Sequence, residues 1–302
     1  MSTSPTFKNS NFSLSIIIPT YNDAHLLKKC LNSLLQQSFL PEEIIVIDDG
    51  SDNNLAQDIC RLSEYSLLSI NYTKIENSGP AKARNFGFNQ ASSEFIIFLD
   101  VDDALPVGAI ESYVSNLDAL ESDSFGLFGR IKFNFPYSSR TTKFLNFSNI
   151  DFNQIGRKNL FEVHISAFLF RREYLQEVGG FRPSLSHNED FDLLLRMCQL
   201  WKFFPINALT LHKNFRSGSQ SNKNYLYSYE GVNQFLSIAK TEGLLSKKEI
   251  LLRQKQNTLT FGKRSLINLQ FQTAGKSFRK AFTFSRPDNF QESVCHLLSI
   301  LL

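Results

Sequence analysis

The stretch that decides the fold reads Phe95-Ile-Ile-Phe-Leu-Asp100-Val-Asp102-Asp103. Its apolar first half, without a polar break, is typical of a parallel strand that is buried on both faces. The strand ends on three carboxylates at the edge of the sheet where open α/β sheets bind their ligands. Clustered carboxylates repel one another unless a cation joins them, and Mg²⁺ or Mn²⁺ prefers such oxygen ligands and often shares them with phosphates. The stretch therefore predicts a site for a divalent metal and a diphosphate.

Strand and helix signals alternate on either side of this stretch. Strands are indicated over residues 14–18, 43–47 and 68–75, and a helical pattern follows each of them. Farther on, we expect a helix over residues 106–120 and a strand over residues 163–170. Such alternation predicts an α/β fold: a Rossmann-like, mainly parallel sheet with flanking helices.

The pattern of apolar and charged residues changes after Ser221. Leu, Ile and Phe recur at helical spacing among many Lys and Arg residues. We expect two parts, an α/β domain over residues 1–220 and a C-terminal helical region over residues 221–302 with three or four helices. A basic amphipathic surface of this kind is attracted to anionic lipids, although the helices could instead simply complete the fold and cover the sheet.

The bulk composition excludes several classes of protein. The chain has 302 residues, of which 42% are hydrophobic and 20% charged, and its net charge is only +3. These proportions are typical of a globular protein, and the low net charge argues against a nucleic-acid binder. The four cysteines are far apart, as expected for reduced thiols. The first residues lack the apolar core of a signal peptide, and no apolar run reaches the roughly 18 residues of a membrane span. We expect a cytoplasmic protein, with peripheral contact at the inner face of the plasma membrane.

Three further polar clusters fall at junctions between predicted strands and helices. The turn Pro19-Thr20-Tyr21-Asn22 could cradle a nucleotide base, or be an ordinary turn. Asp49 could accept a hydrogen bond from a base, while its neighbours could equally cap a helix. Lys82 and Arg84 follow a helix start, where phosphate binds favourably, although a solvated basic face would show the same residues.

Three candidates lie in the second half of the chain. Glu189 and Asp190 begin a predicted helix, where one carboxylate could act as a general base or both could stabilise the helix dipole. His212 is a candidate metal ligand, although a lone histidine after a strand is more often structural. Arg216 lies in a loop that could fold over a diphosphate or simply be part of the surface.

Six short motifs occur in an order and spacing that resemble the family-two inverting glycosyltransferases of the GT-A fold. They are Ser15-Ile-Ile-Ile-Pro-Thr-Tyr-Asn22, Val46-Ile-Asp-Asp-Gly-Ser51, Ala81-Lys-Ala-Arg-Asn-Phe-Gly87, Phe98-Leu-Asp-Val-Asp-Asp103, Val178-Gly-Gly-Phe181 and Glu189-Asp190. Each motif is weak alone, but six in order are highly specific. The resemblance covers about residues 13–220 and leaves residues 221–302 outside it.

The resemblance implies a nucleotide-sugar donor, usually UDP-linked, together with Mn²⁺ or Mg²⁺. It also implies a glycan or lipid-linked acceptor and no nucleic acid. By position, the resemblance implies nucleoside binding by Thr20, Tyr21 and Asp49, and contact with the base or diphosphate by Arg84. It also implies ribose or metal contact by Asp100, metal ligation by Asp102, catalytic base function by Asp190 with Glu189 beside it, and a place in the closing loop for Arg216. The motif reads Asp-Val-Asp-Asp, so Asp102 and Asp103 compete for the metal, and we favour Asp102.

Two other classes of function compete with this interpretation. A nucleotidyltransferase also uses acidic strand ends and a metal, but it would typically carry a Gly-rich loop with Lys or Arg directly after the first strand. Here Pro-Thr-Tyr-Asn22 occupies that place. A non-catalytic relative that only binds or scaffolds should have lost Asp102 or Asp190, and both are present.

Overall fold

The computed structural model describes residues 12–135, 138–141, 163–215 and 225–301. The chain divides into two compact units. The first comprises Met1–Phe181 and Leu200–Phe215, and the second Arg182–Gln199 and Arg216–Leu302. Residues 182–199 thus group with the C-terminal helices in this division, and the domain boundary expected at residue 220 stays a prediction.

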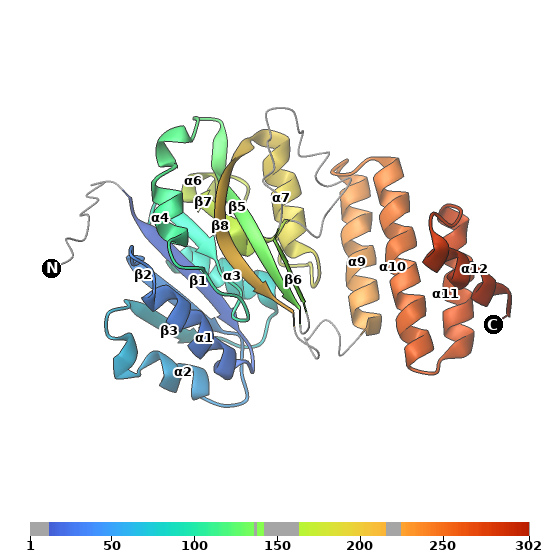
Figure 1. Ribbon diagram of the computed structural model, residues 1–302, viewed down its shortest axis with the longest axis horizontal. Coiled ribbons are helices and arrows are strands. Elements are labelled where there is room, and N and C mark those ends of the chain that lie inside the picture. Colours follow the sequence, from blue (N-terminus) through green and yellow to red (C-terminus); the bar gives the residue numbers. More distant parts are fainter. Residues whose placement is uncertain (1–11, 136–137, 142–162, 216–224, 302) are drawn as a thin grey trace. The chain divides into compact units, whose positions relative to one another are not determined.

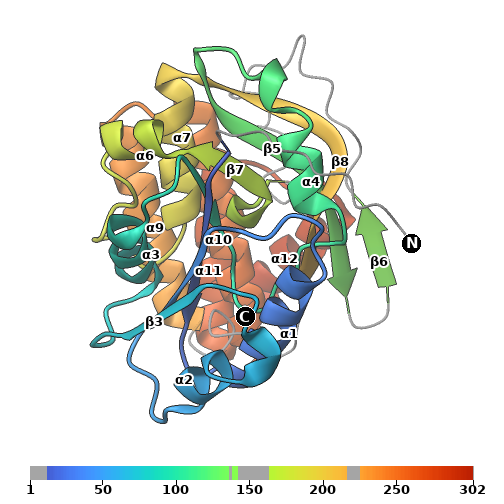
Figure 2. The same cartoon turned by 90° about the vertical axis from the view of Figure 1, so that its left-hand side faces the viewer.

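The first unit is built on a mixed, eight-stranded sheet (Figures 1 and 2). Its strands are β1 (Leu14–Thr20), β2 (Glu43–Asp48), β3 (Ile70–Lys74), β4 (Phe95–Phe98), β5 (Ser124–Phe135), β6 (Ser138–Thr141), β7 (Phe168–Arg171) and β8 (Lys202–Asn214). Their order is β3-β2-β1-β4-β7-β5-β6, with β8 also paired to β5. Pairs among β1–β4 are parallel, whereas β7 joins β4 and β5 in antiparallel fashion. The predicted Rossmann-like, mainly parallel arrangement is confirmed.

The strand register places the candidate site at one edge. Ile17 of β1 lies opposite both Ile45 of β2 and Phe98 of β4, so these three buried strands run level with one another. Thr20 lies opposite Asp48 where β1 and β2 end. Because the three strands are parallel, the polar residues that follow them emerge at the same edge of the sheet.

Helices flank the sheet of the first unit. They are α1 (Ala24–Leu35), α2 (Leu55–Cys60), α3 (Pro80–Gln90), α4 (Ala109–Val114) and α6 (Arg172–Glu177). Helix α3 packs closely on β1, because a Cβ atom added at Gly87 would lie only 2.6 Å from Ile17 Cγ2. The absence of a side chain at Gly87 therefore lets this helix approach the sheet.

Two expected elements are shorter than the sequence indicated. The helix expected over residues 106–120 is wrong in its extent, because Gly108 has a φ of 79° and the chain leaves the helix after Val114. The strand expected over residues 163–170 is wrong in its first half, because Ile165–Ala167 forms a 3₁₀ turn. The Tyr113 hydroxyl donates a hydrogen bond of 2.7 Å to the Ala167 carbonyl and ties this turn to α4.

The second unit is helical in its described part. It holds α7 (Glu189–Leu200), α9 (Tyr225–Thr241), α10 (Lys247–Ile267), α11 (Phe271–Phe284) and α12 (Phe290–Leu301). The prediction of three or four helices after residue 221 is confirmed by α9–α12. Among the described helices, none combines the length and the apolar composition that a membrane span requires.

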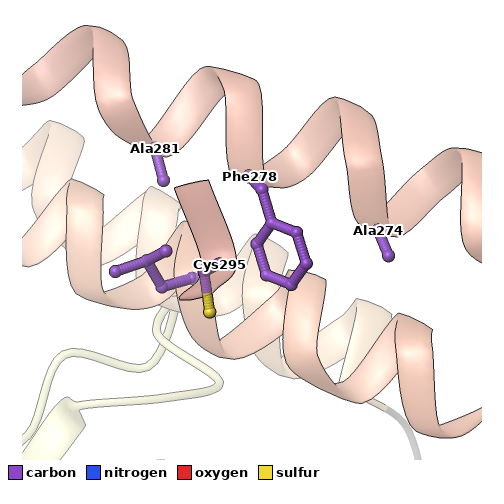
Figure 3. Close-up of a cluster of buried hydrophobic side chains, with 5 residues drawn as sticks. Ala274, Phe278, Ala281 and Cys295 are labelled. Carbon is purple, nitrogen blue, oxygen red and sulfur yellow. The ribbon is translucent and has the colours of Figure 1, made fainter. Parts of the chain in front are cut away.

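A small apolar core holds the last three helices together. Phe278 of α11 points toward Cys295 of α12, with Ala274 and Ala281 one turn to either side (Figure 3). Phe278 is fully buried, and a Cβ atom at Gly262 of α10 would lie 2.6 Å from its ring. The helices α10 and α11 therefore form a closely packed pair.

Candidate metal and donor site

The three aspartates lie on a tight turn directly after β4. The Asp103 amide donates a hydrogen bond of 3.0 Å to the Asp100 carbonyl and closes this turn. The Asp103 side chain is fully buried, whereas those of Asp100 and Asp102 are 20% and 22% exposed. The strand end thus gathers its carboxylates in one partly covered place, as the sequence predicts.

Arg84 of α3 holds the first carboxylate in place. Its Nη2 lies 2.7 Å from Asp100 Oδ1, and its guanidinium sits 5.4 Å from the centroid of the Phe181 ring. Asn85 fixes Phe181 by two hydrogen bonds, of 2.8 and 2.9 Å, to its backbone carbonyl and amide. Burial alone would raise the pKa of Asp100, but the charges of Arg84 and then Lys213 hold it far below its usual range. Arg84 therefore keeps the Asp100 carboxylate ionised.

Lys213, near the end of β8, contributes a second cation that the sequence did not single out. Its Nζ lies 3.5 Å from Asp100 Oδ2, 3.7 Å from Asp102 Oδ1 and 3.2 Å from Asp103 Oδ2. Burial alone would lower the pKa of Lys213, but the three carboxylates raise it. Asn214 secures the adjacent backbone, since its Nδ2 donates to the Asp102 carbonyl at 2.9 Å.

The imidazole of His164 lies beside two of the same carboxylates. Its Nε2 lies 3.5 Å from Asp100 Oδ2, and its Nδ1 lies 3.8 Å from Asp103 Oδ2. The neighbouring 3₁₀ turn positions it, because the Ser166 amide donates to His164 Nδ1 at 3.3 Å and the Ser166 hydroxyl accepts from the Asp100 amide at 3.2 Å. Burial, with the charge of Lys213, lowers the pKa of His164 to about 3. The ring is therefore neutral at pH 7, the form that ligates metals.

One group of side chains in the described residues could hold a metal ion. Asp100, Asp103 and His164 each offer a ligand atom, and these atoms lie within 4.8 Å of one another. Two carboxylate oxygens and one imidazole nitrogen form a donor set that fits Mn²⁺. The sequence had indicated both aspartates but had assigned His164 to a strand, so the turn that aims it at them was not foreseen.

The two remaining metal candidates lie outside that group. Asp102 shares the acidic turn, and Lys213 Nζ lies 3.7 Å from its Oδ1. His212 pairs through its backbone with Ala104 and lies opposite Lys132 in the strand register. Successive side chains of a strand point to opposite faces, so His212 and Lys213 face different sides of β8.

The residues expected to hold the nucleoside occupy the ends of β1 and β2. The Asp49 carboxylate accepts hydrogen bonds of 2.8 Å from the amides of Ser78 and Gly79 and so holds the turn before α3. Thr20 is buried, whereas Pro19 and Tyr21 are partly exposed. Lys82 is exposed on α3, and Arg216 lies outside the described residues.

The candidate base belongs to the second unit. Glu189 is buried and Asp190 partly buried in the first turn of α7. Asp192, two residues farther, is fully buried between two arginines, 3.4 Å from Arg182 Nε and 2.8 Å from Arg196 Nε. These ion pairs fix the first turn of α7 and with it the backbone that carries Asp190.

Several proteins of known name are similar to this chain. A protein of Campylobacter jejuni, "GalNAc(5)-diNAcBac-PP-undecaprenol beta-1,3-glucosyltransferase", is 28% identical over 253 residues, which are 78% of this chain and 76% of that protein. An "Uncharacterized glycosyltransferase" of Rickettsia conorii is 28% identical over 220 residues, or 70% of this chain. This chain spans only 35% of the Rickettsia protein's length.

Solved structures show the same fold. Staphylococcus aureus TarS 1–349 in complex with UDP-GlcNAc has a TM-score of 0.58 and 19% identity over 95% of this chain and 79% of that one. The mannosyltransferase PcManGT of Pyrobaculum calidifontis, in complex with GDP-Man and Mn²⁺, has a TM-score of 0.61 and 16% identity over 96% and 80%. These likenesses confirm the GT-A fold.

The family follows from the sequence. The family model described as "Glycosyl transferase family 2" matches residues 15–179, which is more than half of the chain. The matched range includes the ends of β1, β2 and β4, the acidic turn and His164. The chain therefore belongs to glycosyl transferase family 2.

Proposed function

We propose that the protein is an inverting glycosyltransferase that moves a sugar from a nucleotide-diphosphate donor, a UDP-sugar, to a hydroxyl of a glycan or glycolipid. The main support for this function lies at the edge of the sheet where β1, β2 and β4 end. There, the clustered carboxylates of Asp100, Asp102 and Asp103 meet the neutral ring of His164. A site of this composition suits a divalent cation that carries a diphosphate.

The metal would be held by Asp100, Asp103 and His164, the three side chains whose ligand atoms converge. Asp102 would be a further ligand of this metal, since it lies on the same turn and its side chain is partly exposed. The ion, Mn²⁺ or Mg²⁺, would offset the negative charge that develops on the leaving diphosphate. The structural neighbour bound to GDP-Man and Mn²⁺ supports this assignment through its fold.

Asp190 would act as the general base. Its carboxylate would take the proton of the acceptor hydroxyl while that oxygen attacks the anomeric carbon. Attack from the face opposite the leaving diphosphate inverts the anomeric configuration. Glu189 would support Asp190 from the neighbouring position on α7, and Thr20, Tyr21 and Asp49 would hold the nucleoside.

The acceptor and the place of action are proposed from a relative. The Campylobacter jejuni protein is named for a polyprenol-linked oligosaccharide acceptor, and this chain covers 76% of its length. We therefore place the enzyme in the cytoplasm, peripheral to the inner face of the plasma membrane, where a lipid-linked acceptor would be presented. The contact would be made by the helices of residues 225–301.

Thermal unfolding in the presence of candidate donors tests the proposal. UDP-, GDP- and dTDP-sugars are each added with and without Mn²⁺, because a ligand that binds only the folded state raises the melting temperature. A shift that requires both one nucleotide sugar and Mn²⁺ would identify the donor and support the metal site. The absence of a shift with every donor would favour a non-catalytic relative.

A further inference from the structure

The turn between α10 and α11 exposes three large apolar side chains to solvent. Ile267 is 79% exposed, Leu269 74% and Phe271 49%. They fall within five consecutive residues at one end of a closely packed helical pair. Single exposed apolar residues need no explanation, whereas a contiguous group of them is a feature of interaction sites.

The backbone of this turn makes the choice of Leu269 unusual. The Gln270 amide bonds to the Ser265 carbonyl at 2.9 Å and the Leu269 amide to the Leu266 carbonyl at 3.0 Å, which is the Schellman pattern that ends a helix. In this pattern Leu269 adopts a left-handed conformation, with a φ of 59°. Glycine usually occupies this position, because other side chains are strained there. Leucine thus carries a conformational cost that its exposed side chain does not offset in the monomer.

The charged residues that follow the first turn of α10 are all cationic through the end of α11. Between Glu249 and Asp288 the sequence contains eight Lys and Arg residues and no Asp or Glu. Lys263, one helical turn before Ile267, and Lys276, in the second turn of α11, are both exposed. The apolar turn is therefore flanked by cations.

The turn is also held firmly in place. Phe278 of α11 packs against Gly262 of α10, and the core in Figure 3 locks α11 to α12. The Tyr225 hydroxyl of α9 donates a hydrogen bond to Gln270 Oε1 at 2.5 Å. A rigid support lets the turn present its side chains without first becoming ordered, which lowers the entropic cost of binding.

We propose that this turn, Ile267–Phe271, inserts into the interfacial region of an anionic lipid bilayer, with Lys263 and Lys276 contacting the headgroups. Apolar side chains that enter the interface beside cations are the general features of peripheral membrane binding. A nucleic acid would not require the aliphatic side chains, and a second copy of this chain would bring like charges together. The inference deepens the proposed membrane contact by naming its surface, and it does not depend on the donor chemistry.

Cosedimentation with vesicles tests the insertion. The full chain is mixed with vesicles of phosphatidylcholine alone or of phosphatidylcholine with phosphatidylglycerol, and the variant Leu269→Gly is compared with the wild type. Glycine relieves the left-handed strain, so the variant should keep or raise its melting temperature while its partition coefficient on the anionic vesicles falls roughly tenfold. Loss of binding by a variant at least as stable as the wild type could not be attributed to unfolding. Equal partition of the two proteins would overturn the proposal.

A second pair of variants separates charge from insertion. Lys263→Gln with Lys276→Gln should reduce binding to anionic vesicles, and added salt should weaken the binding of the wild type more than that of this double variant. As a matched control, Leu55→Gly changes an exposed leucine at the start of α2 in the first unit and should leave binding unchanged. Equal loss in the control would show nonspecific adsorption and would overturn the assignment to this turn.

The donor-induced thermal shift is measured on the same variants. It should remain that of the wild type when vesicle binding is lost, because the turn contains none of the residues proposed to hold donor or metal. If the wild type itself failed to bind anionic vesicles while keeping its donor response, this inference alone would be overturned. Failure of the donor response with intact vesicle binding would overturn only the proposed function.

Discussion

The ammonium group of Lys213 lies 3.2 Å from a carboxylate oxygen of Asp103 and within 4 Å of oxygens from the two neighbouring aspartates. A monovalent cation from β8 therefore sits at the oxygens that would receive a divalent metal. The Lys213 ammonium and a bound divalent ion would repel each other at such distances, so the two cations cannot both bind these carboxylates strongly. This relationship predicts competition between Lys213 and the metal.

Replacing Lys213 with methionine should tighten Mn²⁺ binding. The variant removes the competing positive charge while keeping a side chain of similar length, so the affinity for Mn²⁺ in the absence of donor should rise about tenfold or more. Isothermal titration calorimetry, or the electron paramagnetic resonance signal of free Mn²⁺, measures this affinity directly. The melting temperature without metal should fall, because Asp103 loses its nearest cation, and Mn²⁺ should restore it.

A lysine elsewhere on the same strand supplies the control for that measurement. Lys202 forms an ion pair of 2.8 Å with Asp123, and both side chains are largely exposed. Lys202→Met should therefore change neither Mn²⁺ affinity nor stability appreciably. If Lys213→Met also left Mn²⁺ affinity unchanged, the idea of competition would be wrong.

The sequence predicted the sheet edge because its signals were local. The apolar run before Asp100 indicated a buried strand, and parallel strands bring their carboxyl ends to one edge, as the register of Ile17 with Ile45 and Phe98 confirms. His164 and Lys213 could not be found in this way. His164 caps a 3₁₀ turn inside a stretch that read as a continuous strand, and Lys213 acquires its role only when β8 pairs in parallel with β5.

A single polar residue at a strand end can bind a ligand or hold the protein's own backbone, and the sequence alone does not say which. Asp49 was expected to contact the nucleoside, and its carboxylate in fact holds the amides of Ser78 and Gly79. A carboxylate beside a glycine turn is compatible with both roles, and sequence spacing does not distinguish them. Leu269 is likewise exposed because α10 ends just before it, and the spacing of apolar residues in the sequence did not indicate where this helix ends.

Removing the imidazole of His164 should weaken the proposed metal site. His164→Ala deletes one of the three ligands that converge there, so Mn²⁺ affinity should fall about tenfold or more. His212→Ala provides the matched control, because this residue belongs to the same region of the chain but not to the converging group. Equal Mn²⁺ affinity of His164→Ala and the wild type would exclude the histidine as a ligand.

The two competing aspartates of the acidic turn should respond differently to substitution. Asp102→Ala should weaken Mn²⁺-dependent donor binding with little change in melting temperature, because its side chain is partly exposed. Asp103→Ala should also lower the free energy of unfolding by about 3 kcal/mol, because it leaves Lys213 buried without its nearest carboxylate. Chemical denaturation and donor titration, each with and without Mn²⁺, separate the two effects. Unchanged donor binding in Asp102→Ala would remove Asp102 from the metal site.

Asp190→Asn should abolish transfer without preventing donor binding. The amide keeps the size of the side chain but accepts no proton, so turnover should fall about 10²- to 10⁴-fold while the donor-induced thermal shift remains. Asp192→Asn is the control on the same helix turn: its buried carboxylate pairs with Arg182 and Arg196, so its loss should lower stability first and turnover only through stability. Turnover is compared at a temperature where both variants are folded. Near-normal transfer by Asp190→Asn would show that another group accepts the proton, whereas loss of donor binding would show that Asp190 organises the site rather than serving as its base.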